Sequence, residues 1–243
     1  MNPLFVHGVP ETRHIWEEVL LQLGLPLDHA LSLPGFLEEA SPDFAATKDD
    51  YVAWLIAEVE RVGEPVDLVG HDWGFILATR VASVRPDLVR TLIGGSGPIC
   101  ADYEWHPLAR IWQEEGAGEA WFDALDPEAF ASAMMKAGVR AELARAEGQR
   151  LMNPNMHQSI LALYRSSVNM GAVWERDLHR VTAATLLIWG EEDTAVPLRY
   201  AEQMRDHMGA ELLCLDCGHF VPAERPAEYA RAVGQHWERF SRL

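Results

Sequence analysis

Short apolar runs alternate with amphipathic stretches along most of this 243-residue chain, and this alternation limits the possible fold more than any other feature. A short apolar run followed by a segment of helical periodicity is typical of a strand that leads into a covering helix. We predict strands over residues 3–7, 30–33, 66–69, 91–93, 185–189 and 211–215. We predict helices over residues 11–23, 47–59, 75–84 and 198–208, and a last helix from residue 226. The sequence therefore predicts an α/β fold, with a mostly parallel sheet flanked by helices.

The alternation stops between residues 98 and 182. This segment is rich in Ala, Glu and Arg, is interrupted by Pro107, Pro127 and Pro154, and contains no convincing strand. We expect it to form several helices inserted between two strands of the sheet. The predicted organisation is a core of residues 1–97 and 183–243 with a helical cap of residues 98–182.

Charge and cysteine content exclude several classes of partner. The net charge is −17, which repels phosphate backbones and anionic lipid headgroups, so we expect neither nucleic-acid nor membrane binding. The N-terminal residues show no basic segment followed by a long apolar one, and the three cysteines suggest no disulfide framework. We therefore expect a cytoplasmic monomer or homodimer. Cys214 and Cys217 lack a second Cys or His pair, so we expect neither a metal ion nor another cofactor.

A glycine-rich turn follows the strand predicted at residues 66–69. It consists of Gly70, His71, Asp72, Trp73 and Gly74, and it precedes a helix. This is the context of a nucleophile elbow, in which the glycines permit a sharp turn and the central side chain stands above the end of the strand. Taken alone the pattern is weak, because Gly and Asp are common in ordinary turns.

Three further segments lie at predicted strand ends. Asp193 follows the strand at residues 185–189, and His219 follows the strand at residues 211–215. The chain order of nucleophile, acid and histidine is the order expected of a hydrolytic triad on an α/β sheet. Residues 7–10, His-Gly-Val-Pro, follow the first strand, where a backbone N–H for an oxyanion hole is expected.

With these segments in place, the sequence resembles the α/β-hydrolases that have an aspartate nucleophile, which include epoxide hydrolases and haloalkane dehalogenases. The resemblance extends from residues 7–10 to His219 and so covers nearly the whole chain. It implies the α/β-hydrolase fold with a helical cap over the site.

An aspartate at position 72 determines which chemistry is reasonable. A carboxylate is ionised at neutral pH and can therefore act as a nucleophile without a base. Its attack on an ester or amide would give a reactive anhydride, so these substrates do not suit it. Attack on the sp³ carbon of an epoxide or a carbon–halogen bond gives an ordinary alkyl ester. We expect His219, oriented by Asp193, to activate the water that hydrolyses this ester. We expect the backbone N–H groups of Val9 and Trp73 to form the oxyanion hole.

The leaving group separates the two reactions. An epoxide oxygen needs a proton donor, and Tyr164 lies in a segment similar to the cap segment that carries a ring-opening tyrosine. A packing role for this tyrosine, with its hydroxyl in solvent, is the alternative. A halide needs N–H donors, and Val9 stands where many haloalkane dehalogenases have a halide-binding Asn. The sequence therefore favours opening of an epoxide to a diol, with dehalogenation as the alternative.

The other aromatic residues of the segment are candidates for substrate binding. Tyr103 and Trp105 could supply a second donor, and Trp112 could also line the cleft. An aromatic cleft favours a small apolar or aromatic substrate, with water as the second reactant. A protein of this fold could also bind ligands without turnover, but such a binder has no need of Asp72, Asp193 and His219 together.

Overall fold

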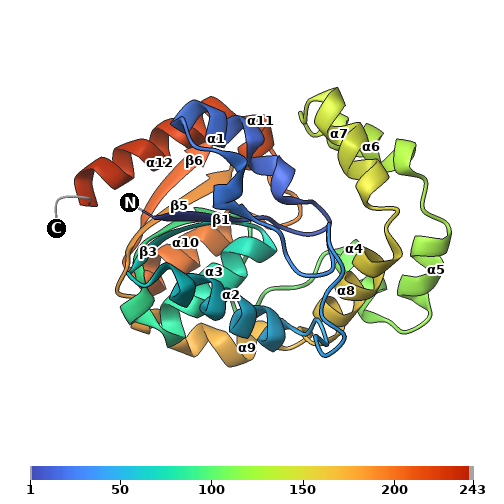
Figure 1. The fold of residues 1–243 in the computed structure, drawn as a ribbon, viewed down its shortest axis with the longest axis horizontal. Coiled ribbons are helices and arrows are strands. Elements are labelled where there is room, and N and C mark those ends of the chain that lie inside the picture. The colour runs from blue at the N-terminus through green and yellow to red at the C-terminus, as the bar shows by residue number, and fades with distance from the viewer. Residues whose placement is uncertain (1, 241–243) are drawn as a thin grey trace.

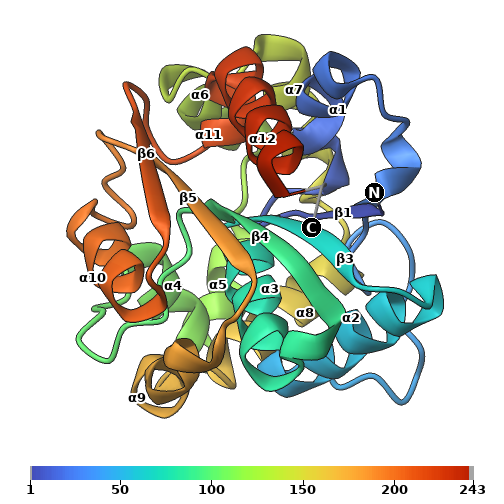
Figure 2. The same ribbon diagram turned by 90° about the vertical axis from the view of Figure 1, so that its left-hand side faces the viewer.

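In the computed structural model, which describes residues 2–240, six strands form one parallel sheet (Figures 1 and 2). The strands are β1 (Pro3–Val6), β2 (Ala30–Leu31), β3 (Val66–His71), β4 (Val89–Gly95), β5 (Ala184–Gly190) and β6 (Glu211–Leu215). Their order across the sheet is β2-β1-β3-β4-β5-β6, and every adjacent pair is parallel. The carboxyl ends of all six strands therefore meet at one edge of the sheet.

Helices cover both faces of this sheet. The covering helices are α1 (Glu17–Leu23), α2 (Lys48–Val62), α3 (Trp73–Val84), α10 (Arg199–Met208), α11 (Val221–Glu224) and α12 (Pro226–Phe240). Figure 2 shows α1, α11 and α12 on one side of the strands, with α2, α3 and α10 on the other. Short 3-10 turns complete the core: η1 (Arg13–Trp16), η2 (Leu27–His29) and η3 (Pro86–Leu88). Helix α3 is almost wholly buried because it lies between the sheet and α2.

Between β4 and β5 the described chain forms helices and turns but no strand. The helices are α4 (Pro107–Gln113), α5 (Ala117–Asp123), α6 (Pro127–Lys136), α7 (Ala141–Arg150), α8 (Pro154–Arg165) and α9 (Met170–Trp174), followed by the 3-10 turn η4 (Glu175–Arg180). Pro107, Pro127 and Pro154 each occupy the first position of a helix, where a missing N–H has no cost. Figure 1 shows α4 to α8 to one side of the sheet, and we refer to residues 98–182 as the helical insertion.

The predicted helix over residues 11–23 is wrong in its first part. Thr12 caps the 3-10 turn η1 by accepting the His14 N–H, and the α-helix starts only at Glu17. Glu11 lies ahead of both and is buried. The predicted helix at residues 75–84 starts two residues earlier, at Trp73, because the turn at Asp72 leads directly into it.

No helix of the described chain is long and apolar enough to cross a membrane.

Helix α2 begins with a reciprocal cap, which yields a prediction on stability. The Thr47 hydroxyl accepts the Asp50 N–H (3.3 Å), and the Asp50 carboxylate accepts the Thr47 N–H (3.0 Å). Thr47→Ala removes the acceptor of the Asp50 N–H but keeps the backbone N–H that the Asp50 carboxylate accepts, and it should lower the free energy of unfolding by about 1 kcal/mol. Chemical denaturation measures this change, and Thr47→Ser, which keeps the hydroxyl, should be close to the parent protein. Equal stability of the Ala and Ser variants would contradict the prediction.

Candidate active site

Asp72 occupies a sharp turn between β3 and α3. Its backbone has φ 49° and ψ −122°, outside the conformations that residues with a side chain prefer. Gly74 permits the close passage of β1, because a Cβ there would lie 2.0 Å from the Val6 carbonyl oxygen. The Asp72 side chain therefore lies at the carboxyl edge of the sheet, buried except for a small exposed fraction.

The turn after β1 supplies one N–H to this carboxylate. The Val9 N–H donates to Asp72 Oδ2 (2.9 Å). Gly8 makes the approach possible, since a Cβ at that position would lie 2.6 Å from the Asp72 Cβ. Within residues 2–240, the Trp73 N–H forms no hydrogen bond with the Asp72 side chain, so only one of the two predicted oxyanion donors is engaged. Both donor assignments remain predictions.

His219 lies between two carboxylates. Its Nδ1 is 2.9 Å from Asp193 Oδ2, and its Nε2 is 3.8 Å from Asp72 Oδ1. Asp193 Oδ1 accepts the N–H groups of Ala195 and Val196 (2.9 and 2.8 Å), which fixes its orientation. The loops after β3, β5 and β6 thus bring Asp72, Asp193 and His219 together, in the arrangement of a nucleophile, an orienting acid and a base.

The electrostatics of the three groups are coupled. Burial lowers the pKa of His219, but the hydrogen bond with Asp193 and the charges of Asp193 and Asp72 outweigh this effect and raise its pKa to about 10. Burial raises the pKa of Asp72, against the opposing charge of His219. Burial also disfavours the Asp193 carboxylate, but His219 keeps the pKa of Asp193 below its ordinary value. The charges of Asp193 and Asp72 therefore favour a protonated His219, while burial opposes the charge on Asp72.

Tyr164, from α8, is buried beside this centre. Its side chain is only 2% exposed, and its ring packs edge-on against Trp73, with centroids 5.4 Å apart. Burial raises the pKa of Tyr164 well above its ordinary value, and the Asp72 charge adds to this, whereas a hydrogen bond with the Trp73 side chain opposes it. The phenol therefore lies within the field of Asp72, and its hydroxyl is not free in solvent.

Of the other predicted aromatic residues, Trp105 and Tyr103 use their polar atoms elsewhere, and Trp112 packs against Tyr164. Trp105 stacks on Trp73 with ring centroids 5.8 Å apart, yet its indole N–H donates to the Val168 carbonyl (3.3 Å). The Tyr103 hydroxyl donates to the Ala195 carbonyl (3.2 Å). Trp112 is buried behind Tyr164, with ring centroids 5.0 Å apart. These contacts make Trp112 a packing support for Tyr164.

Sequence analysis missed a third buried carboxyl at the site, that of Glu11. Glu11 is 1% exposed, and its Oε1 lies 3.1 Å from Nε2 of His71, which is equally buried. A Cβ on Gly8 would lie 2.5 Å from Glu11 Oε1 and 2.8 Å from Asp72 Oδ2, so the two carboxyl groups converge on the same glycine. Burial raises the pKa of Glu11 to about 8 and lowers that of His71 to about 3. At neutral pH both groups are therefore uncharged. Glu11 directly follows the His-Gly-Val-Pro segment of residues 7–10, and this position was the one sequence feature that could have pointed to a role at the site.

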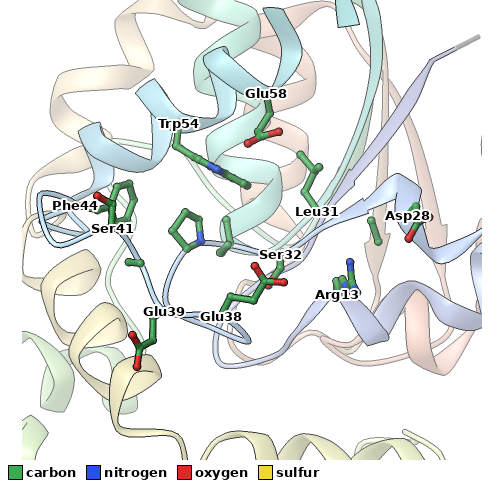
Figure 3. Close-up of a pocket in the computed structure, with 14 residues that line it drawn as sticks. Arg13, Asp28, Leu31, Ser32, Glu38, Glu39, Ser41, Phe44, Trp54 and Glu58 are labelled. Carbon is green, nitrogen blue, oxygen red and sulfur yellow. The ribbon is translucent and has the colours of Figure 1, made fainter. Parts of the chain in front are cut away.

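The described residues of the site offer no arrangement for a metal, and the cavity beside β2 lies away from the site. Within residues 2–240 no group of three or more His, Cys, Asp or Glu side chains could hold a metal ion. A cavity of about 460 Å³ lies beside β2, with Trp54 and Glu58 of α2 on one side and Glu38 and Glu39 on the other (Figure 3). None of the three site residues borders this cavity.

The raised pKa of Glu11 predicts that the free energy of unfolding depends on pH. Between pH 4.5 and about 8 the unfolded chain ionises Glu11 while the folded protein keeps it protonated, so stability falls as the pH rises through this window. Glu11→Gln does not titrate, and its stability relative to the parent should rise between those pH values. Denaturation curves at several pH values measure this difference. Glu228→Gln, which changes an exposed carboxyl on α12, is the control. A stability difference between Glu11→Gln and the parent protein that stays constant across these pH values would contradict the prediction.

Comparison with known proteins gives the family of the chain. Residues 4–232 match the alpha/beta hydrolase family. A haloalkane dehalogenase of Bradyrhizobium diazoefficiens is 30% identical over 95% of this chain and 84% of its own length. Lipase LipV of Mycobacterium tuberculosis is 28% identical over 95% of this chain and 90% of its own length. Epoxide hydrolase 2 of Siraitia grosvenorii is 35% identical over 37% of this chain and 30% of its own length. The predicted fold class and resemblance are confirmed: the chain belongs to the alpha/beta hydrolase family and is a hydrolase of that type.

Proposed function

We propose that this hydrolase opens a small apolar or aromatic epoxide to a diol, through an ester formed on Asp72. The observation that carries the proposal is the buried Tyr164 phenol, packed edge-on against Trp73 and within the field of the Asp72 carboxylate. A carboxylate attacks an epoxide carbon readily, and the oxygen that leaves needs a proton donor nearby. The helical insertion then acts as the cap that brings this donor to the nucleophile.

The first step forms the ester. An Asp72 oxygen attacks one epoxide carbon, the carbon–oxygen bond breaks, and the alkoxide takes the Tyr164 proton. The raised pKa of Tyr164 keeps the phenol protonated until this moment, and an alkoxide is a much stronger base than a phenolate. The protonated His219 can then return a proton to the Tyr164 phenolate, which leaves a neutral imidazole.

The second step hydrolyses the ester. The negative charge of Asp72 is one of those that raise the pKa of His219. Esterification removes this charge, which lowers the pKa of His219 and favours the neutral imidazole. Neutral His219 takes a proton from water, the hydroxide attacks the ester carbonyl, and the Val9 N–H stabilises the oxyanion. Collapse releases the diol and restores the Asp72 carboxylate beside a protonated His219. The net reaction is epoxide plus water to diol, with no cofactor.

Hydrolytic dehalogenation is the second candidate, because a relative that is 30% identical over 95% of this chain is named a haloalkane dehalogenase. Asp72 and His219 would act as described, and the Trp73 indole would bind the halide. The geometry favours this reaction less. The Trp105 N–H is bonded to the Val168 carbonyl, and Val9 brings no side-chain donor.

The two-step mechanism predicts that the intermediate accumulates when His219 is removed. His219→Gln should still form the ester on Asp72 but lose turnover by about 10³-fold, the scale of a missing general base. Intact-protein mass spectrometry after mixing with an epoxide should show the protein plus one substrate mass, and digestion should place it on the Asp72 peptide. Asp72→Asn should show no adduct. If the parent protein turns over an epoxide and His219→Gln stays unmodified, the covalent mechanism is wrong.

The proton donor is tested by Tyr164→Phe. Loss of the hydroxyl should slow epoxide opening by about 10²-fold and leave any halide release unaffected. Diol and halide release from a panel of epoxides and haloalkanes measure the two rates. An unchanged epoxide rate would remove Tyr164 from the mechanism. Halide release without diol formation by the parent protein would favour dehalogenation, and no turnover at all would favour a binding protein.

A further inference from the structure

Glu224, the last residue of α11, holds the peptide groups on both sides of His219. Its Oε2 accepts the Gly218 N–H (2.7 Å), and its Oε1 accepts the Phe220 N–H (2.9 Å). Hydrogen bonds to a charged acceptor are about twice as strong as those between neutral groups. One carboxylate therefore fixes the backbone directly before and directly after His219.

Backbone hydrogen bonds also shape this loop, and they do not need the Glu224 side chain. The Val221 N–H donates to the His219 carbonyl (2.9 Å), and the Glu224 N–H donates to the Phe220 carbonyl (2.9 Å). The start of α11 can therefore form in a variant with another side chain at position 224. A substitution at Glu224 therefore tests what the carboxylate contributes to the position of the His219 loop, without loss of α11.

The His219 ring leaves little tolerance for movement of its backbone. Nδ1 must stay within hydrogen-bonding distance of Asp193, now 2.9 Å, while Nε2 faces Asp72 at 3.8 Å. The ring has only two side-chain torsions, so its position follows the loop. A misplacement of about 1 Å in a reacting group can cost about 10²-fold in rate.

We propose that Glu224 is a positioning residue for His219, which promotes hydrolysis of the Asp72 ester but not its formation. This inference rests on the proposed function, because His219 serves as a base only in the second step. Glu224 acts on the reaction through the His219 loop.

This division gives a kinetic signature. In a two-step covalent mechanism, kcat/KM reports the steps up to ester formation, whereas kcat includes ester hydrolysis. In Glu224→Gln, kcat should fall by about 10-fold to 10²-fold, and KM should fall with it. The value of kcat/KM should stay within a factor of about three, and the ester on Asp72 should become visible by mass spectrometry during turnover. A variant that merely misfolds in part would lose kcat and kcat/KM together.

The variants are chosen to isolate the carboxylate. The Gln amide keeps the size of Glu224 but has one acceptor oxygen, and its NH₂ group would face one of the two backbone N–H groups. Glu224→Asp keeps the charge but is one methylene shorter, so it should bridge the two N–H groups poorly and show the same signature more mildly. Glu228→Gln, which changes an exposed carboxyl four residues later on α12, is the matched control and should leave kcat unchanged.

A second measurement does not depend on turnover. The proton between His219 Nδ1 and Asp193 should give a low-field NMR signal in the parent protein and in Glu228→Gln. In Glu224→Gln this signal should shift or broaden, because the ring is no longer held in one position.

The outcomes separate this inference from the proposed function. An unchanged low-field signal together with an unchanged kcat in Glu224→Gln overturns the positioning role. A parallel loss of kcat and kcat/KM without an adduct also overturns it, since the residue would then be structural. If His219→Gln forms no adduct, the covalent mechanism fails, and the NMR signal alone decides whether Glu224 orients His219.

Discussion

The backbone turn at Asp72 is the constraint on which the rest of the site depends. Its positive φ is uncommon for a residue with a side chain and costs about 1–3 kcal/mol. The conformation persists because both ends are fixed: the Asp72 N–H donates to the Gly95 carbonyl of β4 (2.9 Å), and its carbonyl accepts the N–H groups of Phe75 and Ile76 (3.0 Å each). The packed sheet and α3 therefore hold the carboxylate at the edge where the other strand-end loops arrive.

Charge balance is the second constraint, since several carboxyl groups share a small buried volume. Asp72 and Asp193 flank His219, and Glu11 lies beside Asp72. Burial keeps Glu11 protonated at neutral pH, which spares Asp72 a neighbouring negative charge that would raise its pKa further. The imidazolium then faces two negative groups rather than three. In the proposed mechanism, an ester on Asp72 changes this balance by one charge and so couples the covalent state of Asp72 to the basicity of His219.

The sequence predicted the parts of the site that depend on local pattern. The elbow at Asp72 and the loops carrying Asp193 and His219 are marked by apolar runs that end in short polar segments, so their meeting at one edge follows from a parallel sheet. Contacts between distant residues could not be predicted. Glu11 looked like the start of a helix, and only the fold places it against Asp72. The hydrogen bond from Trp105 to Val168 likewise depends on how the segments before α4 and α9 are arranged.

The helical insertion contacts the core close to both of the loops that surround Asp72. Glu147 of α7 is fully buried and accepts a hydrogen bond from the Thr12 hydroxyl (2.8 Å), just after the turn that supplies the Val9 N–H. At the turn between α6 and α7, a Cβ on Gly138 would lie 3.3 Å from the Glu224 side chain. The same helical pair thus borders the oxyanion turn and the His219 loop, while α8 supplies Tyr164. Because these contacts belong to one continuous insertion, the proposed proton donor, oxyanion donor and base all lie in or beside segments that this insertion contacts.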